Sequence, residues 1–113
     1  MAKFRFTQWL WDWLSALPRF SFEWDAGNVA KSFQKHSVTC EDAEEVFATR
    51  RFVPLGEQVQ PPSPEPRFGV LGETSQGKLL FVAFTLRNQS IRVISARPMN
   101  IRERKFYASL RQE

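Results

Sequence analysis

The chain has 113 residues, a length that suits one domain with a single hydrophobic core. Its hydrophobic content of 42% and charged content of 25% are typical of a folded protein, and no apolar run approaches the roughly 20 residues that a membrane span needs. The formal net charge of +4 favours an anionic partner, while the single cysteine excludes an internal disulfide and suits a reducing compartment such as the cytoplasm.

The first eighteen residues, M-A-K-F-R-F-T-Q-W-L-W-D-W-L-S-A-L-P, are unusually aromatic. Thr7 suits a helix N-cap and Pro18 cannot continue a helix, so we predict a short helix between them. The run is short and interrupted by Asp12, which argues against a signal peptide. We therefore expect an aromatic N-terminal extension, residues 1–18, that docks onto the main domain, residues 19–113, onto a second copy or onto a partner.

The next segments predict one strand and two helices. Residues 19–25, R-F-S-F-E-W-D, alternate apolar and polar side chains, which is typical of a half-buried strand. Asp25 then suits the N-cap of a helix that runs to His36. Thr39, with Asp42 three residues later, is close to a capping box and predicts a second helix.

The middle of the chain predicts a short strand, a stiff connection and a meander. A strand at residues 51–55 precedes G-E-Q-V-Q-P-P-S-P-E-P at residues 56–66, whose prolines favour an extended, polyproline-like loop. Three strands follow, at residues 67–72, 78–87 and 91–97. The second of them is an almost continuous apolar run, so we expect a central strand that is covered on both faces.

The last part of the chain carries most of the positive charge. Asn100 and Glu103 form an N-cap and N3 pair for a final helix, and the order of elements indicates an α+β fold. From Arg87 to the end there are seven cationic and two acidic side chains, a net charge of +5. A strand that leads into a helix N-terminus is a favourable place for a phosphate. A plain solvated basic face is the alternative.

Several side chains in this part suit phosphate chemistry. Arg67 opens one strand and Arg87 closes the next, so antiparallel pairing places them at the same end of the sheet, with Arg97 on the neighbouring strand. Guanidinium groups gathered there form a clamp for a phosphate whose charge grows in a transition state, although arginines at strand ends are commonly just solvated. Tyr107 lies one helical turn after Glu103, so a phenol and a carboxylate can meet and move a proton. A core tyrosine with a satisfied hydroxyl is the alternative.

Two further side chains are candidates from their chemistry alone. His36 can transfer a proton, but a lone histidine on an apolar helix face is more often a packed residue. Trp24, at a strand end, can stack on a base, and core packing is its alternative. One histidine and one cysteine give no spacing typical of metal ligands, so we expect neither a metal nor another cofactor.

Several stretches, in family order from about residue 20 to residue 108, resemble the BrnT toxins of type II toxin–antitoxin systems. They are Phe22-Glu-Trp-Asp25 with Asn28, Lys31 and Lys35-His36; E-D-A-E-E-V-F at 41–47; E-P-R-F at 65–68; T-L-R at 85–87; and I-R-V-I-S-A-R at 91–97 with Glu103 and Tyr107. The resemblance implies a RelE-like fold with an antiparallel four-stranded sheet, two N-terminal helices and a C-terminal helix.

The same resemblance implies an activity and partners. The family members are metal-independent endoribonucleases, which act in the cytoplasm on mRNA, free or on the ribosome, inhibit translation and are neutralised by a BrnA-like antitoxin. A homodimer and a heterotetramer with the antitoxin are the assemblies to expect. One alternative is a catalytically decayed module that acts through its complex with an antitoxin. Another is a nucleic-acid-binding protein that does not cleave.

Family position also implies roles for individual residues. Arg67 and Arg97 stabilise the phosphate, and Tyr107 and His36 are the proton-transfer candidates. The residues that bind RNA are Trp24, Thr85, Arg87 and Lys35.

Overall fold

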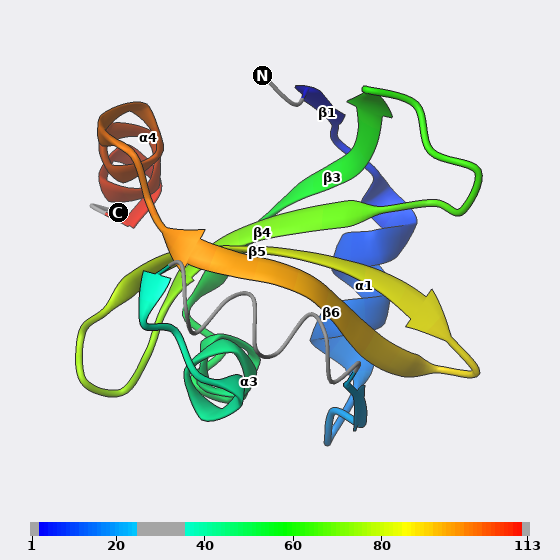
Figure 1. Ribbon diagram of the computed structural model, residues 1–113, viewed down its shortest axis with the longest axis horizontal. Helices are drawn as coiled ribbons and strands as arrows, with labels where there is room; N and C mark the ends of the chain where they lie inside the picture. The colour runs from blue at the N-terminus through cyan, green and yellow to red at the C-terminus, as the bar shows by residue number, and fades with distance from the viewer. Residues whose placement is uncertain (1–2, 25–35, 112–113) are drawn as a thin grey trace.

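The computed structural model describes residues 3–24 and 36–111 (Figure 1). The helix that we predict from Asp25 to His36 therefore lies outside the described residues, except for His36, which is helical. The described elements, in chain order, are β1 (Lys3–Arg5), α1 (Gln8–Ala16), β2 (Phe22–Glu23), α3 (Cys40–Ala48), β3 (Phe52–Gln60), β4 (Phe68–Glu73), β5 (Leu79–Arg87), β6 (Ser90–Pro98) and α4 (Ile101–Arg111).

The sheet has six strands within the described ranges, in the order β1-β3-β4-β5-β6-β2. The α+β class is as predicted, and β3 to β6 form the expected antiparallel meander. The prediction of a four-stranded antiparallel sheet is nevertheless wrong for the sheet as a whole, which is mixed. β1 pairs antiparallel with β3 at one edge, and β2 pairs parallel with β6 at the other. β1 is too short to show an alternating pattern, and the alternation at residues 19–25 predicts a strand but not its neighbour, so the sequence did not reveal these pairings.

The third strand is longer than predicted because Gly56 lies inside it. Sequence alone suggested that the strand ends before this glycine and that a loop begins there. Instead, the pairing with β4 shifts register between Pro54 and Gly56, which is a β-bulge, and the strand continues to Gln60. Gly56 has φ +108, and a Cβ at this position would lie 1.8 Å from the carbonyl oxygen of Arg5. Only glycine therefore allows β1 to lie beside this part of β3.

One face of the sheet is covered by α1 and α3, and Phe47 lies at the centre of its core. The Phe47 ring centroid lies 5.4 to 5.8 Å from those of four other rings, which belong to Phe20, Phe22, Phe52 and Phe84. Aromatic pairs at these spacings add to the stabilisation from burial. The alternating segment before residue 25 therefore does direct its apolar side chains inward, although its regular strand is only Phe22–Glu23.

The aromatic extension packs into this same core. Leu10 and Leu14 of α1 are completely buried, while Trp9 and Trp11 are about half exposed. At the end of the helix, the Arg50 guanidinium donates hydrogen bonds to the carbonyl oxygens of Leu14 and Leu17. Leu10 and Leu14 thus contact the main domain of the same chain, which is one of the three expected docking partners.

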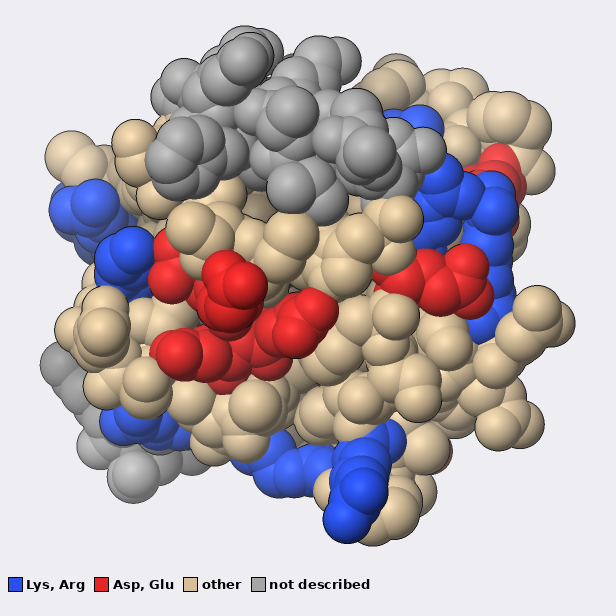
Figure 2. Space-filling model, turned by 60° about the horizontal axis from the view of Figure 1, so that its bottom comes forward, with Lys and Arg blue, Asp and Glu red and all other residues tan. Residues whose placement is uncertain are grey.

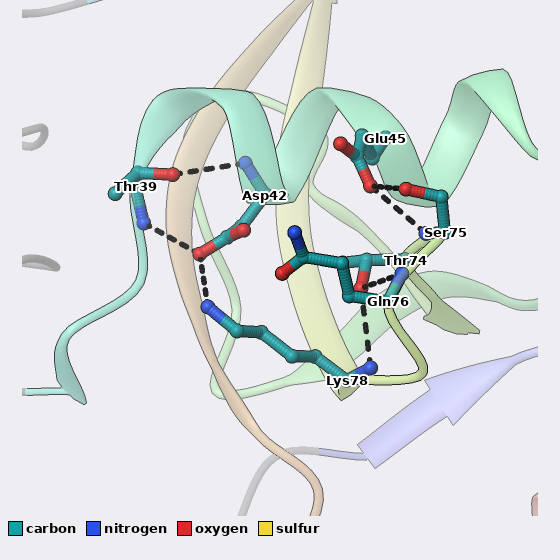
Figure 3. A network of polar contacts seen from close by, with 7 residues as sticks. All are labelled: Thr39, Asp42, Glu45, Thr74, Ser75, Gln76 and Lys78. Carbon is teal, nitrogen blue, oxygen red and sulfur yellow. Dashed lines mark hydrogen bonds and ion pairs between the residues drawn. The ribbon is translucent and has the colours of Figure 1, made fainter.

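The N-terminus of α3 is tied to the turn between β4 and β5 (Figure 3). The predicted capping box is present, since the Thr39 hydroxyl and the Asp42 carboxylate accept hydrogen bonds from each other's backbone N–H at 3.1 Å. Lys78 Nζ lies 3.0 Å from the same carboxylate. Burial alone raises the pKa of Asp42, but the bonds from Thr39 and Lys78 outweigh it and the net pKa is lowered. The ionised Asp42 carboxylate therefore contributes to stability fully above its unfolded-state pKa, and this contribution is lost as the pH falls through its folded-state pKa.

The opposite face of the sheet is only partly covered. In Figure 1, α4 stands over one end of the sheet, on the side away from α3. Its Tyr107 packs with Leu71 and Phe81, and the Phe4 ring of β1 lies 5.8 Å from Phe81. The predicted cap of α4 is present, because Asn100 and Glu103 exchange hydrogen bonds of 2.8 and 2.9 Å. In the described part of the chain, no helix is long and apolar enough to cross a membrane.

Candidate functional site

A groove of about 380 Å³ opens on this partly covered face, and we call it the arginine groove. Its floor comes from β5 and β6, where Phe81 pairs with Arg97 and Ala83 pairs with Ser95, so these side chains share one side of the sheet. The residues that line it are Phe4, Leu55, Gln58, Arg67, Phe81, Ala83, Ile94, Ser95, Arg97, Asn100, Arg102 and Glu103. Three arginines and one carboxylate therefore surround an apolar floor.

Arg97 is held firmly at the edge of this groove. Its guanidinium carbon lies 4.4 Å from the Phe81 ring centroid, and its two Nη atoms lie 2.8 and 2.9 Å from the two carboxylate oxygens of Glu103. Glu103 in turn accepts the Asn100 N–H at the start of α4. A planar guanidinium fixed by stacking and by a bidentate pair keeps its remaining N–H groups in one orientation, which suits recognition of an anion.

A second hollow, of about 270 Å³, adjoins the arginine groove, and we call it the threonine hollow. Its lining includes Thr85, Arg87 and Arg92, and Arg67 lines both this hollow and the groove. Arg87 is paired with Glu65, with Nε–Oε2 and Nη2–Oε1 distances of 3.2 and 3.3 Å. The hydrogen bond from Arg87 lowers the pKa of Glu65, so this carboxylate is charged at neutral pH.

The structure thus divides the predicted arginine clamp between two adjoining hollows. Arg67 and Arg97 line the first, Arg67 and Arg87 line the second, and Thr85 lies in the second. The pairing of Glu103 with Arg97 was not predicted, because the N3 position of Glu103 already accounts for it as a capping residue. Arg92 was also missed as a lining residue, although the alternation of its strand places it on the same side as Ile94.

The other candidate residues lie elsewhere. His36 is exposed and lines a separate hollow with Lys78 and Arg104, which shares no lining residue with the arginine groove. The Trp24 Nε1 donates a hydrogen bond of 2.6 Å to Glu44, and the ring packs against the core on the α3 side of the sheet. Lys35 lies outside the described residues.

Tyr107 is buried, and its hydroxyl lies 2.9 Å from the Glu73 carboxylate and 3.0 Å from the Arg51 carbonyl oxygen. The carboxylate bonded to the phenol is therefore on β4, whereas Glu103 pairs with Arg97. Neither the arginine groove nor the threonine hollow includes Tyr107 among its lining residues. This geometry is that of a core tyrosine with a satisfied hydroxyl.

Replacing Tyr107 with phenylalanine is expected to lower the free energy of unfolding by about 1–2 kcal/mol, because the Glu73 carboxylate and the Arg51 carbonyl lose a buried donor. The same substitution is expected to leave the rate of any reaction in the arginine groove within about twofold of wild type, since Tyr107 is not among the residues that line the groove. Denaturant unfolding and single-turnover kinetics measure the two effects. A large loss of rate in a protein of normal stability would instead assign Tyr107 to the chemistry.

Acidic side chains gather on the side of the sheet that α3 covers. The face shown in Figure 2 carries a cluster of Asp and Glu side chains, and α3 contributes four acidic residues in the sequence C-E-D-A-E-E-V-F-A. The arginine groove lies on the other side of the sheet from α3. Among the residues that the structure describes, no three His, Cys, Asp or Glu side chains lie together in a way that suits a metal ion.

Comparisons with known proteins point to one family. A family model described as the ribonuclease toxin BrnT of type II toxin–antitoxin systems matches residues 24–103. A comparison with curated proteins found no match. Among solved structures, the crystal structure of the Brucella abortus ribonuclease toxin BrnT aligns over 73% of this chain and 99% of that chain, with 22% sequence identity and a TM-score of 0.48. The family match includes Arg67, Arg97 and Glu103 and begins after β1 and α1.

Proposed function

The chain belongs to the BrnT family of ribonuclease toxins of type II toxin–antitoxin systems, and from this membership we propose that it is a metal-independent endoribonuclease that cleaves mRNA and inhibits translation. The observation that carries the proposal is the arginine groove, in which Arg67 and Arg97 face one cavity on the open side of the sheet. A groove with guanidinium walls and an apolar floor suits a nucleotide, whose phosphate is anionic and whose base is flat and largely apolar.

In the proposed reaction, the ribose 2′-oxygen attacks the adjacent phosphorus. The bond between the 2′-oxygen and phosphorus forms while the bond between phosphorus and the 5′-oxygen breaks, which leaves a 2′,3′-cyclic phosphate and a 5′-hydroxyl. Negative charge grows on the non-bridging oxygens, where Arg67 and Arg97 donate hydrogen bonds that strengthen in the transition state. The 2′-hydroxyl proton passes to the Glu103 carboxylate, which lines the groove, and the leaving oxygen takes a proton from water.

Replacing Glu103 with glutamine is expected to lower kcat by about 100-fold at neutral pH, because an amide does not accept the 2′-hydroxyl proton. Glutamine keeps an oxygen that accepts one of the two hydrogen bonds from Arg97, so the guanidinium retains part of its positioning. Single-turnover kinetics at neutral pH measures the loss of kcat. A kcat within about threefold of wild type would limit Glu103 to holding Arg97.

We further propose a protein antitoxin of the BrnA type as the partner and the cytoplasm as the site of action. A type II toxin is held inactive by a bound protein, and mRNA in the translating compartment is the substrate that its ribonuclease activity requires. The basic side chains of the arginine groove are the group that such an antitoxin must cover or displace from RNA.

Cell-free translation tests the proposed function. Addition of the purified protein is expected to shorten the reporter mRNA and to stop protein synthesis, whereas Arg97→Ala leaves the mRNA intact. If the mRNA stays intact with the wild-type protein, the enzyme proposal fails. Formation of an antitoxin complex under the same conditions would then favour the alternative of a module that acts only through complex formation.

A further inference from the structure

The Thr85 hydroxyl is an unsatisfied buried group. Thr85 is only 2% exposed, and its Oγ1 has no hydrogen-bond partner in the part of the chain that the structure describes. A buried hydroxyl without a partner is destabilising, whereas valine fills the same space without this cost. The described residues therefore leave this hydroxyl available to a ligand, which can satisfy it in another state.

The surroundings of this hydroxyl are strongly cationic. Thr85 pairs with Arg92 across β5 and β6, and the threonine hollow is also lined by Arg67 and Arg87. Guanidinium groups offer only donors, and the threonine hydroxyl adds one more. A set of donors around a small cavity is complementary to a phosphate, which offers only acceptors at neutral pH.

We propose that the threonine hollow binds a second phosphate of the RNA chain, next to the phosphate that is cleaved in the arginine groove. This inference rests on the proposed ribonuclease function and narrows its substrate to RNA strands with at least two successive phosphates. Arg67 and Ile94 line both cavities, so the two sites adjoin as successive phosphates of one strand do. A dinucleotide with one phosphate fills only the arginine groove.

A phosphate reaches Thr85 only if a side chain at the rim of the hollow shifts. Arg87 and Glu65 both line the hollow, and movement of this pair opens it. Both side chains are 44% exposed, and exposed ion pairs hold their geometry with little free energy. An incoming phosphate replaces Glu65 as the anionic partner of Arg87 and at the same time accepts a hydrogen bond from Thr85. The pair therefore keeps the hollow occupied by a weak internal anion until RNA binds.

Trinucleotides that carry a 2′-hydroxyl on only one ribose test the proposal, because each has a single cleavable linkage and one additional phosphate on its 5′ or 3′ side. The measured quantity is the ratio of kcat/KM for a trinucleotide to kcat/KM for the corresponding dinucleotide. Thr85→Val is expected to lower this ratio by about tenfold or more for one of the two trinucleotides, since it loses a hydrogen bond to a charged group. Thr85→Ser keeps a hydroxyl and is expected to retain the ratio.

Thr74 provides a matched control. It is also a buried threonine of this sheet region, but its hydroxyl accepts hydrogen bonds from the backbone N–H groups of Gln76 and Lys78. Thr74→Val is expected to destabilise the protein and to leave the ratio unchanged. Thr85→Val is expected to show the reverse, with unfolding no easier than in wild type and a lowered ratio.

Three outcomes would overturn the second-phosphate site. They are an unchanged ratio in Thr85→Val, an equal loss of ratio in Thr74→Val, and the absence of any advantage of a trinucleotide over a dinucleotide in wild type. If the wild-type protein cleaves none of these substrates, the proposed function fails while the site stays testable. Binding of a trinucleotide without any 2′-hydroxyl is then measured, and equal affinity of wild type and Thr85→Val would exclude the site.

Discussion

Replacing Arg97 with alanine is expected to lower kcat for RNA cleavage by about 100-fold to 1,000-fold, the usual cost of removing one preorganised donor from a developing oxyanion. The guanidinium is stacked on Phe81 and held by Glu103, so it meets the phosphate without further ordering. Alanine leaves Phe81 in place, removes these donors and leaves Glu103 without its guanidinium partner. The expected loss is therefore in the chemical step, with a smaller change in KM.

Arg104→Ala is the matched control for this prediction. Arg104 also belongs to the basic C-terminal region and its loss changes the net charge equally, but it is exposed and lines the separate hollow that contains His36. We expect its kcat to stay within about threefold of wild type, because a surface charge that does not line the groove affects encounter more than chemistry. Arg97→Lys is expected to remain impaired, since an ammonium group does not reproduce the bidentate pair with Glu103. Equal losses in Arg97→Ala and Arg104→Ala would reduce Arg97 to a contributor of general positive charge.

Replacing Leu14 with alanine is expected to lower the free energy of unfolding by about 2–5 kcal/mol, which is the range for removing a fully buried leucine side chain. Leu14 has no exposed surface and packs in the core cluster that contains Phe47. A domain of this size has a total stability of about 5–15 kcal/mol, so the variant loses a large share of it. A loss of this size is expected because α1, although it precedes the family match, contributes side chains to the core.

Ser15→Ala in the same helix is the control, because Ser15 is exposed at the neighbouring position. We expect its free energy of unfolding to stay within about 0.5 kcal/mol of wild type. Urea denaturation, followed by far-ultraviolet circular dichroism, measures both variants. A loss below about 1 kcal/mol in Leu14→Ala would mean that α1 is a detachable arm.

Local patterns in the sequence predicted the elements that depend on neighbouring residues. The pairs Thr39 with Asp42 and Asn100 with Glu103 are capping interactions within one turn, and both are present. The apolar run of β5 correctly predicted a central strand, because a strand that is covered on both faces needs apolar side chains in both directions.

Features that depend on distant residues were missed. β1 has three residues and is positioned by the long edge of β3, and Gly56 was interpreted as a strand end although it is a bulge. The extension is unusually aromatic, but its fully buried residues are Leu10 and Leu14 rather than the tryptophans beside them. The side of the short helix that meets the sheet decides which of its residues are buried, and the sequence of the helix does not show which side that is.

The position of the arginines was predicted in part. Arg67 and Arg87 lie near the same end of the sheet, whereas Arg97 lies further along β6, opposite Phe81, and lines only the arginine groove. The division into a groove and a hollow depends on side-chain packing between strands that are not neighbours in sequence. The unsatisfied hydroxyl of Thr85 is likewise a property of the folded state, since the sequence shows a threonine but not its lack of a partner.

The chemistry of the RNA ends tests the proposed reaction most directly. The purified protein is incubated with one RNA oligonucleotide in the presence of EDTA, and the termini of the fragments are identified by mass spectrometry. The mechanism through the 2′-hydroxyl predicts fragments that end in a 2′,3′-cyclic phosphate and begin with a 5′-hydroxyl, formed at the same rate with and without the chelator. Fragments with 3′-hydroxyl and 5′-phosphate ends, or cleavage that EDTA abolishes, would contradict it.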